Sequence, residues 1–180
     1  KKFDKRSITE PTVENVTKGS KDSFIENFRS NTATVRRKIK TPDLVVEQLT
    51  IGEQTRTPVG LVYVDTIANE DLLKEVRQRI NTMNVDNMLT SGFIEEFLSD
   101  NSNSVFPQVL NPERPDTFCA NIIEGRVGIL IDGIPFGFVV PATLVQLMQT
   151  PEDYSRNYIV ASFIRIIRAV CIFLSLMLPS

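Results

Sequence analysis

The sequence predicts an α/β fold in which a mixed β-sheet with a central hairpin is flanked by helices, followed by a C-terminal helix that leads into a membrane. Three observations support this prediction. Short β-branched runs have the length of strands, apolar residues between them recur at helical intervals, and residues 169–180 carry no charge. We expect an extended lead-in at 1–18, an α/β domain at 19–150 and, at 151–180, a helix that enters a truncated transmembrane segment.

The first predicted helix runs from Asp22 to about Lys38, after the polar lead-in. Its apolar residues recur at near-helical spacing and are Phe24, Ile25, Phe28, Val35 and Ile39. Pro42 ends this pattern, because a proline disfavours helical geometry in the residue before it.

Two strands and a second helix come next. Residues 44–51 and 59–64 are β-branched runs on either side of a turn at 52–57, which predicts a paired hairpin. Asn69 is a suitable N-cap for the helix that follows, which has acidic residues in its first turn and arginines later, as the helix dipole favours. The apolar side of this helix consists of Leu72, Leu73, Val76 and Ile80.

A second hairpin is the strongest signal in the remaining part of the domain. Residues 127–131 and 136–140 are apolar on both faces, and the Asp132-Gly133 pair between them is typical of a hairpin turn. Apolar residues on both faces predict a central position in the sheet. Four further elements are expected, namely a strand at 85–89 and helices at 91–98, 117–124 and 143–148.

The apolar run at 169–180 predicts a membrane boundary. A spanning helix needs about 20 apolar residues, so these 12 residues are too few to span by themselves. Arg165 and Arg168 lie just before the run, and charged side chains favour the interface over the bilayer centre. We therefore expect a longer protein whose membrane segment begins after these arginines. The alternative is an apolar core helix that ends at Pro179.

Positive charge is concentrated in the first part of the chain. The net charge is −2, yet residues 1–40 contain 11 Lys and Arg against 5 Asp and Glu. The cluster Arg36, Arg37, Lys38 and Lys40 lies at the end of the first predicted helix, where cations complement the helix dipole. This interpretation is favoured over phosphate binding, because no aromatic residues alternate with the cations. We expect no nucleic-acid partner.

The composition excludes most familiar catalytic and metal sites. The chain has no histidine, which removes Ser-His and Cys-His pairs and the imidazole ligands of metals. Cys119 and Cys171 lack the spacing of a metal or redox pair, and Cys119 has no basic neighbour in sequence closer than Arg114. We therefore expect no enzyme activity, no catalytic residue, no metal and no cofactor.

Several motifs, taken in order, resemble one known family. They are Ser7-Ile8-Thr9-Glu10-Pro11, Phe24-Ile25-Glu26 with Asn31, Arg36-Arg37-Lys38-Ile39, Phe106-Pro107-Gln108, Glu113-Arg114-Pro115-Asp116, residues 124–136 and Val140-Pro141. Together they resemble the A subunits of the spore nutrient-germinant receptors, the GerA family. The blocks at 113–116 and 125–127 are the most specific. Ser20 and Pro112 depart from the family pattern, which has proline and threonine there.

The resemblance implies a function, a location and partners. It implies the cytoplasmic, core-facing portion of a receptor subunit in the spore inner membrane, which couples nutrient sensing to ion release and germination. It also implies an integral-membrane B subunit, a lipoprotein C subunit and an A-subunit homo-oligomer as partners. The candidate loop or interface residues are Glu113, Arg114, Pro115, Asp116, Arg126, Asp132 and Gly133. For Arg114 and Asp116, an internal ion pair that holds the loop is an equal alternative.

Two other functions stay open at this point. The domain itself could hold a small nutrient or a nucleotide in a cleft between the sheet and the helices. An enzyme would rest only on Cys119 and on scattered carboxylates, such as Glu95 and Glu96, which point about 100° apart on a helix.

Overall fold

The structure is a computed structural model that describes residues 22–83, 91–99 and 107–143, together with residues 162, 166–168, 170, 171, 174, 175 and 177. The described residues up to Ala142 belong to one compact unit and those from Thr143 onward belong to a second. The two units are described separately below.

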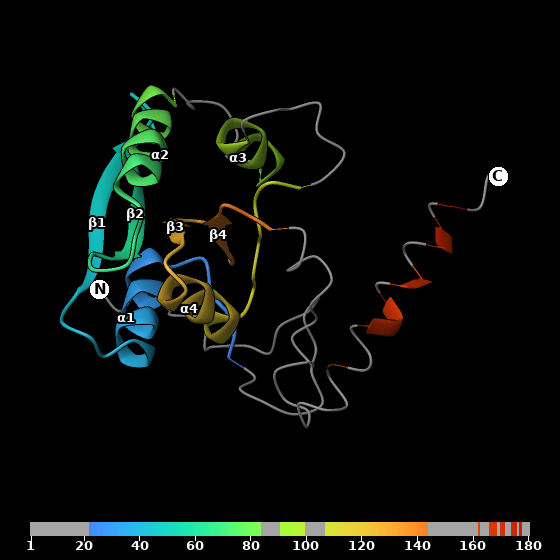
Figure 1. Ribbon diagram of the computed structural model, residues 1–180. Coiled ribbons are helices and arrows are strands. Elements are labelled where there is room, and N and C mark those ends of the chain that lie inside the picture. Colours follow the sequence, from blue (N-terminus) through green and yellow to red (C-terminus); the bar gives the residue numbers. More distant parts are fainter. Residues whose placement is uncertain are drawn as a thin grey trace. The chain divides into compact units, whose positions relative to one another are not determined.

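The first unit is a four-stranded antiparallel sheet flanked by four helices (Figure 1). Its elements are α1 Phe28–Lys38, β1 Leu44–Ile51, β2 Thr57–Val64, α2 Glu70–Thr82, α3 Ser91–Leu98, α4 Pro115–Ile123, β3 Val127–Ile131 and β4 Gly137–Val140. The strand order is β1-β2-β3-β4, and every neighbouring pair is antiparallel. The α/β fold with a helix-flanked sheet is confirmed, although every strand pair is antiparallel where a mixed sheet was expected.

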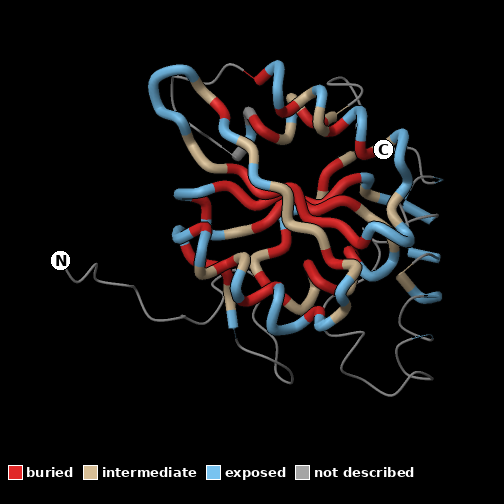
Figure 2. Tube along the Cα trace, turned by 90° about the vertical axis from the view of Figure 1, so that its left-hand side faces the viewer, coloured by how far each residue is buried: buried red, intermediate tan, exposed pale blue. Residues whose placement is uncertain are grey.

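Alternate residues of each strand build two apolar layers, one on each face of the sheet. On β2, Val59, Leu61 and Tyr63 pack in the layer that contains α2 and α3. Val62 and Val64, which point to the other face, pack in the layer that contains α1 and α4. Figure 2 shows the buried strands enclosed between segments with exposed outer sides. Both faces of the sheet are therefore covered by helices.

The hairpin predicted from Asp132-Gly133 joins β3 to β4, but it is not central in the sheet. The two interior strands are β2 and β3, whereas β4 is the last strand in the order. Both strands of the hairpin are fully buried because helices cover their faces, and a bridge between Leu110 and Val139 lies along the outer side of β4. An apolar pattern on both faces therefore indicates that helices cover the strand on both sides. It does not indicate whether the strand lies in the interior of the sheet or at its end beside a loop.

The helix boundaries follow local capping. Asn69 caps α2 as predicted, because its side-chain oxygen accepts from the backbone N–H groups of Asp71 and Leu72 at 2.9 and 3.3 Å. Helix α4 begins at Pro115, two residues earlier than predicted, since proline suits the first position of a helix. Helix α1 begins at Phe28 and not at Asp22, so residues 22–27 precede the helix.

Several predictions fall outside the described residues, namely the extended lead-in at 1–18, the strand at 85–89, nearly all of the helix at 143–148, Arg165 and much of 151–180. In the second unit, the described residues between 162 and 177 are helical. Among the residues that the structure describes, no helix combines the length and the apolar content that crossing a bilayer requires.

Candidate functional site

Residues from distant parts of the sequence converge on residues 24–28, which we call the anchored segment. The backbone N–H of Phe24 donates to the carbonyl oxygen of Glu113 at 2.9 Å. The N–H of Gly133 donates to the carbonyl oxygen of Glu26 at 2.8 Å. The loop before α4 and the β3–β4 turn therefore hold the chain that leads into α1.

Asn31 fixes the same segment from within α1. Its side-chain oxygen accepts from the N–H of Ile25 at 3.0 Å, and its amide nitrogen donates to the carbonyl oxygen of Ile25 at 2.5 Å. Asn31 is 2% exposed, so both bonds are shielded from water. Its amide thus completes the hydrogen bonding of a backbone that belongs to neither a helix nor a strand.

Asp132 and Gly133 connect the β3–β4 turn to the start of α1. The first N–H groups of a helix have no partner within the helix. Asp132 Oδ1 accepts from the N–H of Phe28 at 3.0 Å, while Asn27 Oδ1 accepts from that of Ser30 at 3.0 Å. Gly133 has a φ of +85°, which favours glycine in this turn. The turn therefore caps a helix located about one hundred residues earlier in the sequence.

Arg114 and Asp116 form an internal ion pair. Arg114 is 3% exposed, and its Nε and Nη2 donate to the two carboxylate oxygens of Asp116 at 3.0 and 2.5 Å. Asp116 Oδ1 also accepts from the N–H of Thr117 at 2.9 Å, and the buried Pro115 is the first residue of α4. The pair thus fixes the loop before α4. This is the internal ion pair expected from the sequence as the alternative to an interface role for these two residues.

The ion pair predicts a pH-dependent contribution to stability. Burial raises the pKa of Asp116, but the hydrogen bonds and positive charge of Arg114 outweigh it, so the pKa lies below its ordinary value of 3.8. Because the folded-state pKa is lowered, the stabilisation is present above the pKa of the unfolded chain and is lost as the pH falls through the folded-state pKa.

We expect Asp116→Asn to lower the free energy of unfolding by about 1–2 kcal/mol at pH 7. A fully buried pair would give a loss of about 3–5 kcal/mol, but the side chain of Asp116 is 36% exposed. Urea unfolding between pH 7 and 3 should show the difference from the native chain shrinking as the pH falls. The control is Asp71→Asn, whose side chain is 93% exposed. A difference that stays constant over this range would contradict the ion-pair explanation.

Arg126 joins the end of α4 to the start of β3. Its Nη1 donates to Asn121 Oδ1, and its Nη2 lies 3.1 Å from Glu124 Oε2. Asn121 in turn donates to the carbonyl oxygen of Thr117 at 2.7 Å. Gly125, with a φ of +92°, allows the helix to end in this tight turn. Arg126 is therefore part of a helix-terminating network.

The thiol of Cys119 lacks the exposure and the lowered pKa of a reactive cysteine. Burial raises its pKa to about 12, with a smaller opposing effect of the Lys38 charge. A thiol with such a pKa is protonated at neutral pH, whereas reactive cysteines have lowered values. Within the described residues, no group of three or more His, Cys, Asp or Glu side chains is arranged to hold a metal ion. The arrangement of Cys119 therefore provides no support for an enzyme.

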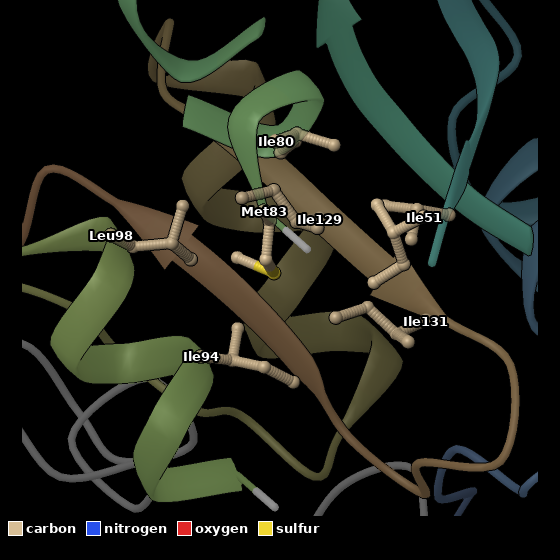
Figure 3. Close-up of a pocket in the computed structure, with 8 residues that line it drawn as sticks. Ile51, Ile80, Met83, Ile94, Leu98, Ile129 and Ile131 are labelled. Carbon is tan, nitrogen blue, oxygen red and sulfur yellow. The ribbon is translucent and has the colours of Figure 1, made fainter. Parts of the chain in front are cut away.

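A small apolar pocket lies between the sheet and the helices α2 and α3 (Figure 3). Seven aliphatic side chains and Met83 line it, and those of Ile51, Met83 and Ile94 point towards one another. The volume of this cavity is about 10 Å³, whereas pockets for small ligands have about 300–1,000 Å³ and a few polar groups. This pocket therefore lacks the features that a nutrient-binding cleft needs.

The structure places the motif residues in two groups and reveals others that sequence reasoning missed. Glu113, Asp132 and Gly133 meet at the anchored segment, while Arg114, Asp116 and Arg126 stabilise the two ends of α4. Arg168 is a half-buried helical residue of the second unit. The missed residue is Asn121, which joins Arg126 to α4. Asn31 was named only as part of a family motif, and its polar side chain on the apolar side of a helix was a signal for the buried bonds that it makes.

Comparison with known proteins places the chain in a family. The family model described as "Bacillus/Clostridium GerA spore germination protein" matches residues 1–180. Spore germination protein B1 of Bacillus subtilis (strain 168) is 40% identical over 174 residues, which are 97% of this chain and 36% of that protein. YfkQ of the same organism, an uncharacterized membrane protein, is 42% identical over 176 residues, which are 98% of this chain and 34% of that protein.

A solved structure is similar as well. The crystal structure of the N-terminal domain of the A subunit of the Bacillus megaterium spore germinant receptor GerK3 has a TM-score of 0.55 and 43% sequence identity, and the match covers 68% of this chain and 97% of that chain. The chain spans about a third of the length of the curated relatives that it matches. Since the family model matches the whole chain, this protein belongs to the GerA family of Bacillus and Clostridium spore germination proteins.

Proposed function

We propose that this chain is the cytoplasmic portion of a spore germinant-receptor A subunit, which couples nutrient sensing to ion release and germination through receptor assembly. The observation that carries the proposal is the 43% identity and similar fold shared with the N-terminal domain of a germinant-receptor A subunit. The match of the family model to all 180 residues supports it further.

The proposed partners are an integral-membrane B subunit, a lipoprotein C subunit and further copies of the A subunit. The proposed location is the spore inner membrane, with this portion facing the core. The names of several relatives as spore germination proteins support a role in this process. The name of YfkQ as a membrane protein supports attachment to a bilayer.

We propose further that residues 1–18 lead into an α/β domain at 19–150 and that 151–180 enters a membrane, with Arg165 and Arg168 at its boundary. Support comes from apolar side chains at the described helical positions of the second unit, which are exposed. Their exposed fractions are 62% for Ile166, 47% for Ile167, 51% for Val170, 52% for Leu174 and 66% for Met177. Such a concentration of exposed apolar surface is typical of contact with lipid or protein.

The anchored segment suggests how the domain transmits a signal. It is held at four points by Glu113, Asn31, Gly133 and Asp132, which belong to the α4 loop, α1 and the β3–β4 turn. A displacement of the chain before α1 would therefore act on the sheet and on α4 together. In this proposal, Glu113 and Asp132 serve as coupling positions, and Arg126 keeps α4 in its place on the sheet.

The test is Arg126→Ala in the full-length A subunit, expressed in spores. We expect either a loss of assembled receptor or a response to nutrient at least about tenfold slower, because α4 loses its link to β3. Lys74→Ala is the matched control, since Lys74 is exposed on α2 and makes only surface ion pairs. The two measurements are subunit abundance by immunoblot and the rate of germination. Normal abundance together with a normal rate would contradict the proposal.

A further inference from the structure

The outer face of α1 carries positive charge that no carboxylate among the described residues pairs with. At about 100° per residue, Arg29, Ala33, Arg36 and Arg37 fall within an arc of about 100°, opposite the buried side of the helix. Three of these residues are arginines, and all four are exposed. Lys40, which follows the helix, is exposed as well. None of the ion pairs among the described residues includes these cations.

The helices on the other face of the sheet have a different charge pattern. Helix α1 has four cations and no carboxylate, whereas α2 and α3 together have three cations and five carboxylates. The three cations there are paired, Lys74 with Glu70 and Asp71, Arg77 with Glu47, and Arg79 with Glu75. Since α1 packs in the opposite apolar layer, the sheet separates the cationic helix α1 from the acidic helices α2 and α3.

We infer that the outer face of α1, defined by Arg29, Arg36, Arg37 and Lys40, docks on the anionic phospholipid surface of the membrane that this chain enters. The inference rests on the proposed function. Attachment through the C-terminal segment would hold the domain near lipid headgroups, where each Lys or Arg contributes about 1 kcal/mol of attraction to an anionic surface, that is, about fivefold in partitioning. The face has no aromatic side chain for stacking bases, which favours lipid over nucleic acid.

The inference is tested by flotation of the 180-residue chain with vesicles of phosphatidylcholine alone and of phosphatidylcholine mixed with phosphatidylglycerol. We expect Arg29→Gln with Arg36→Gln to weaken partitioning onto the anionic vesicles about 30-fold and to leave binding to phosphatidylcholine unchanged. About 0.5 M salt should abolish the preference for anionic vesicles by screening. Neither arginine side chain makes a hydrogen bond or ion pair with another described residue, so the fold should persist, which circular dichroism checks.

The matched control is Arg56→Gln with Lys74→Gln, which removes the same charge from exposed positions elsewhere. We expect this pair to change binding to anionic vesicles by less than about threefold. Equal losses for both pairs, or tighter binding of the native chain to RNA than to anionic vesicles, would overturn the inference. Failure of the chain to bind vesicles of phosphatidylcholine alone would count against the proposed membrane-entering segment. The difference in binding between the two kinds of vesicle would still test whether α1 docks on anionic lipid.

Discussion

Replacing Gly128 with valine is expected to lower the free energy of unfolding by about 3 kcal/mol. Gly128 lies in the interior strand β3, where an added Cβ would be 2.3 Å from Phe118 Cζ and 2.7 Å from Ile122 Cδ1. The ring of Phe118 has no room to move, because it is 0% exposed, meets Phe24 edge-on at 5.3 Å and lies against Gly137 as well. Either the ring or the strand must therefore leave its position.

Urea unfolding followed by circular dichroism measures this effect. Gly92→Ala is the matched control, because a Cβ at Gly92 meets no atom within 4 Å and alanine suits a helix better, by about 0.5–1 kcal/mol. Combining Gly128→Val with Phe118→Ala should cost less than the sum of the two single changes, since the second removes the ring that the first displaces. A native-like urea midpoint for Gly128→Val alone would show that the ring is not confined.

The strands and the fold class could be predicted because their signals are local. β-branched runs, the Asp132-Gly133 pair and the Asn69 cap each act within a few residues, and all three appear as predicted. The order of the strands depends instead on contacts between distant segments, such as the loop residue Leu110 that pairs with the outer edge of β4. That information was absent from the periodicity, so the hairpin was wrongly placed at the centre of the sheet.

The start of α1 shows why the remaining details could not be predicted. Phe24 and Ile25 have helical spacing relative to Phe28, yet residues 22–27 lie outside the helix. The partners that hold this backbone are Glu113, Asp132 and Gly133, which are about one hundred residues distant in sequence. Periodicity reports which side chains are apolar, and it does not report which backbone groups distant residues will bond.

The candidate site was only partly accessible from sequence for the same reason. The family resemblance selects Asp132 and Arg114 without stating what they contact. The structure gives the first a helix-capping bond and the second a buried ion pair. Their role in an interface stays a prediction, and the anchored segment itself could be found only from the folded chain.

Replacing Asn31 with aspartate is expected to lower the free energy of unfolding by about 3 kcal/mol at pH 7. The change keeps an acceptor for the N–H of Ile25 but places a second carboxylate oxygen against the carbonyl oxygen of Ile25, which now accepts at 2.5 Å from the amide nitrogen. Two acceptors then face each other at a site that is 2% exposed. A buried carboxylate without a donor and an unbonded carbonyl group both destabilise the fold.

The pH dependence separates this explanation from a simple loss of packing. Burial raises the pKa of the introduced carboxyl above the value of about 3.9 in the unfolded chain. Because the folded variant then binds the proton more tightly, its stability falls as the pH rises from about 4 towards the raised pKa and recovers when the pH is lowered. A protonated carboxyl can again donate to the carbonyl oxygen of Ile25, which is the physical basis of the recovery.

The control for this experiment is the same chemical change at Asn27, the exposed N-cap of α1. Aspartate caps a helix as well as asparagine and favours its N-terminus, so Asn27→Asp should stay within about 0.5 kcal/mol of the native chain. Urea unfolding of both variants at pH 7 and near pH 4.5 should show a pH-dependent loss only for Asn31→Asp. Equal losses at both pH values would mean that the Asn31 side chain stabilises the fold by packing and not by its hydrogen bonds to Ile25. The anchored segment would then depend on Glu113, Asp132 and Gly133 alone.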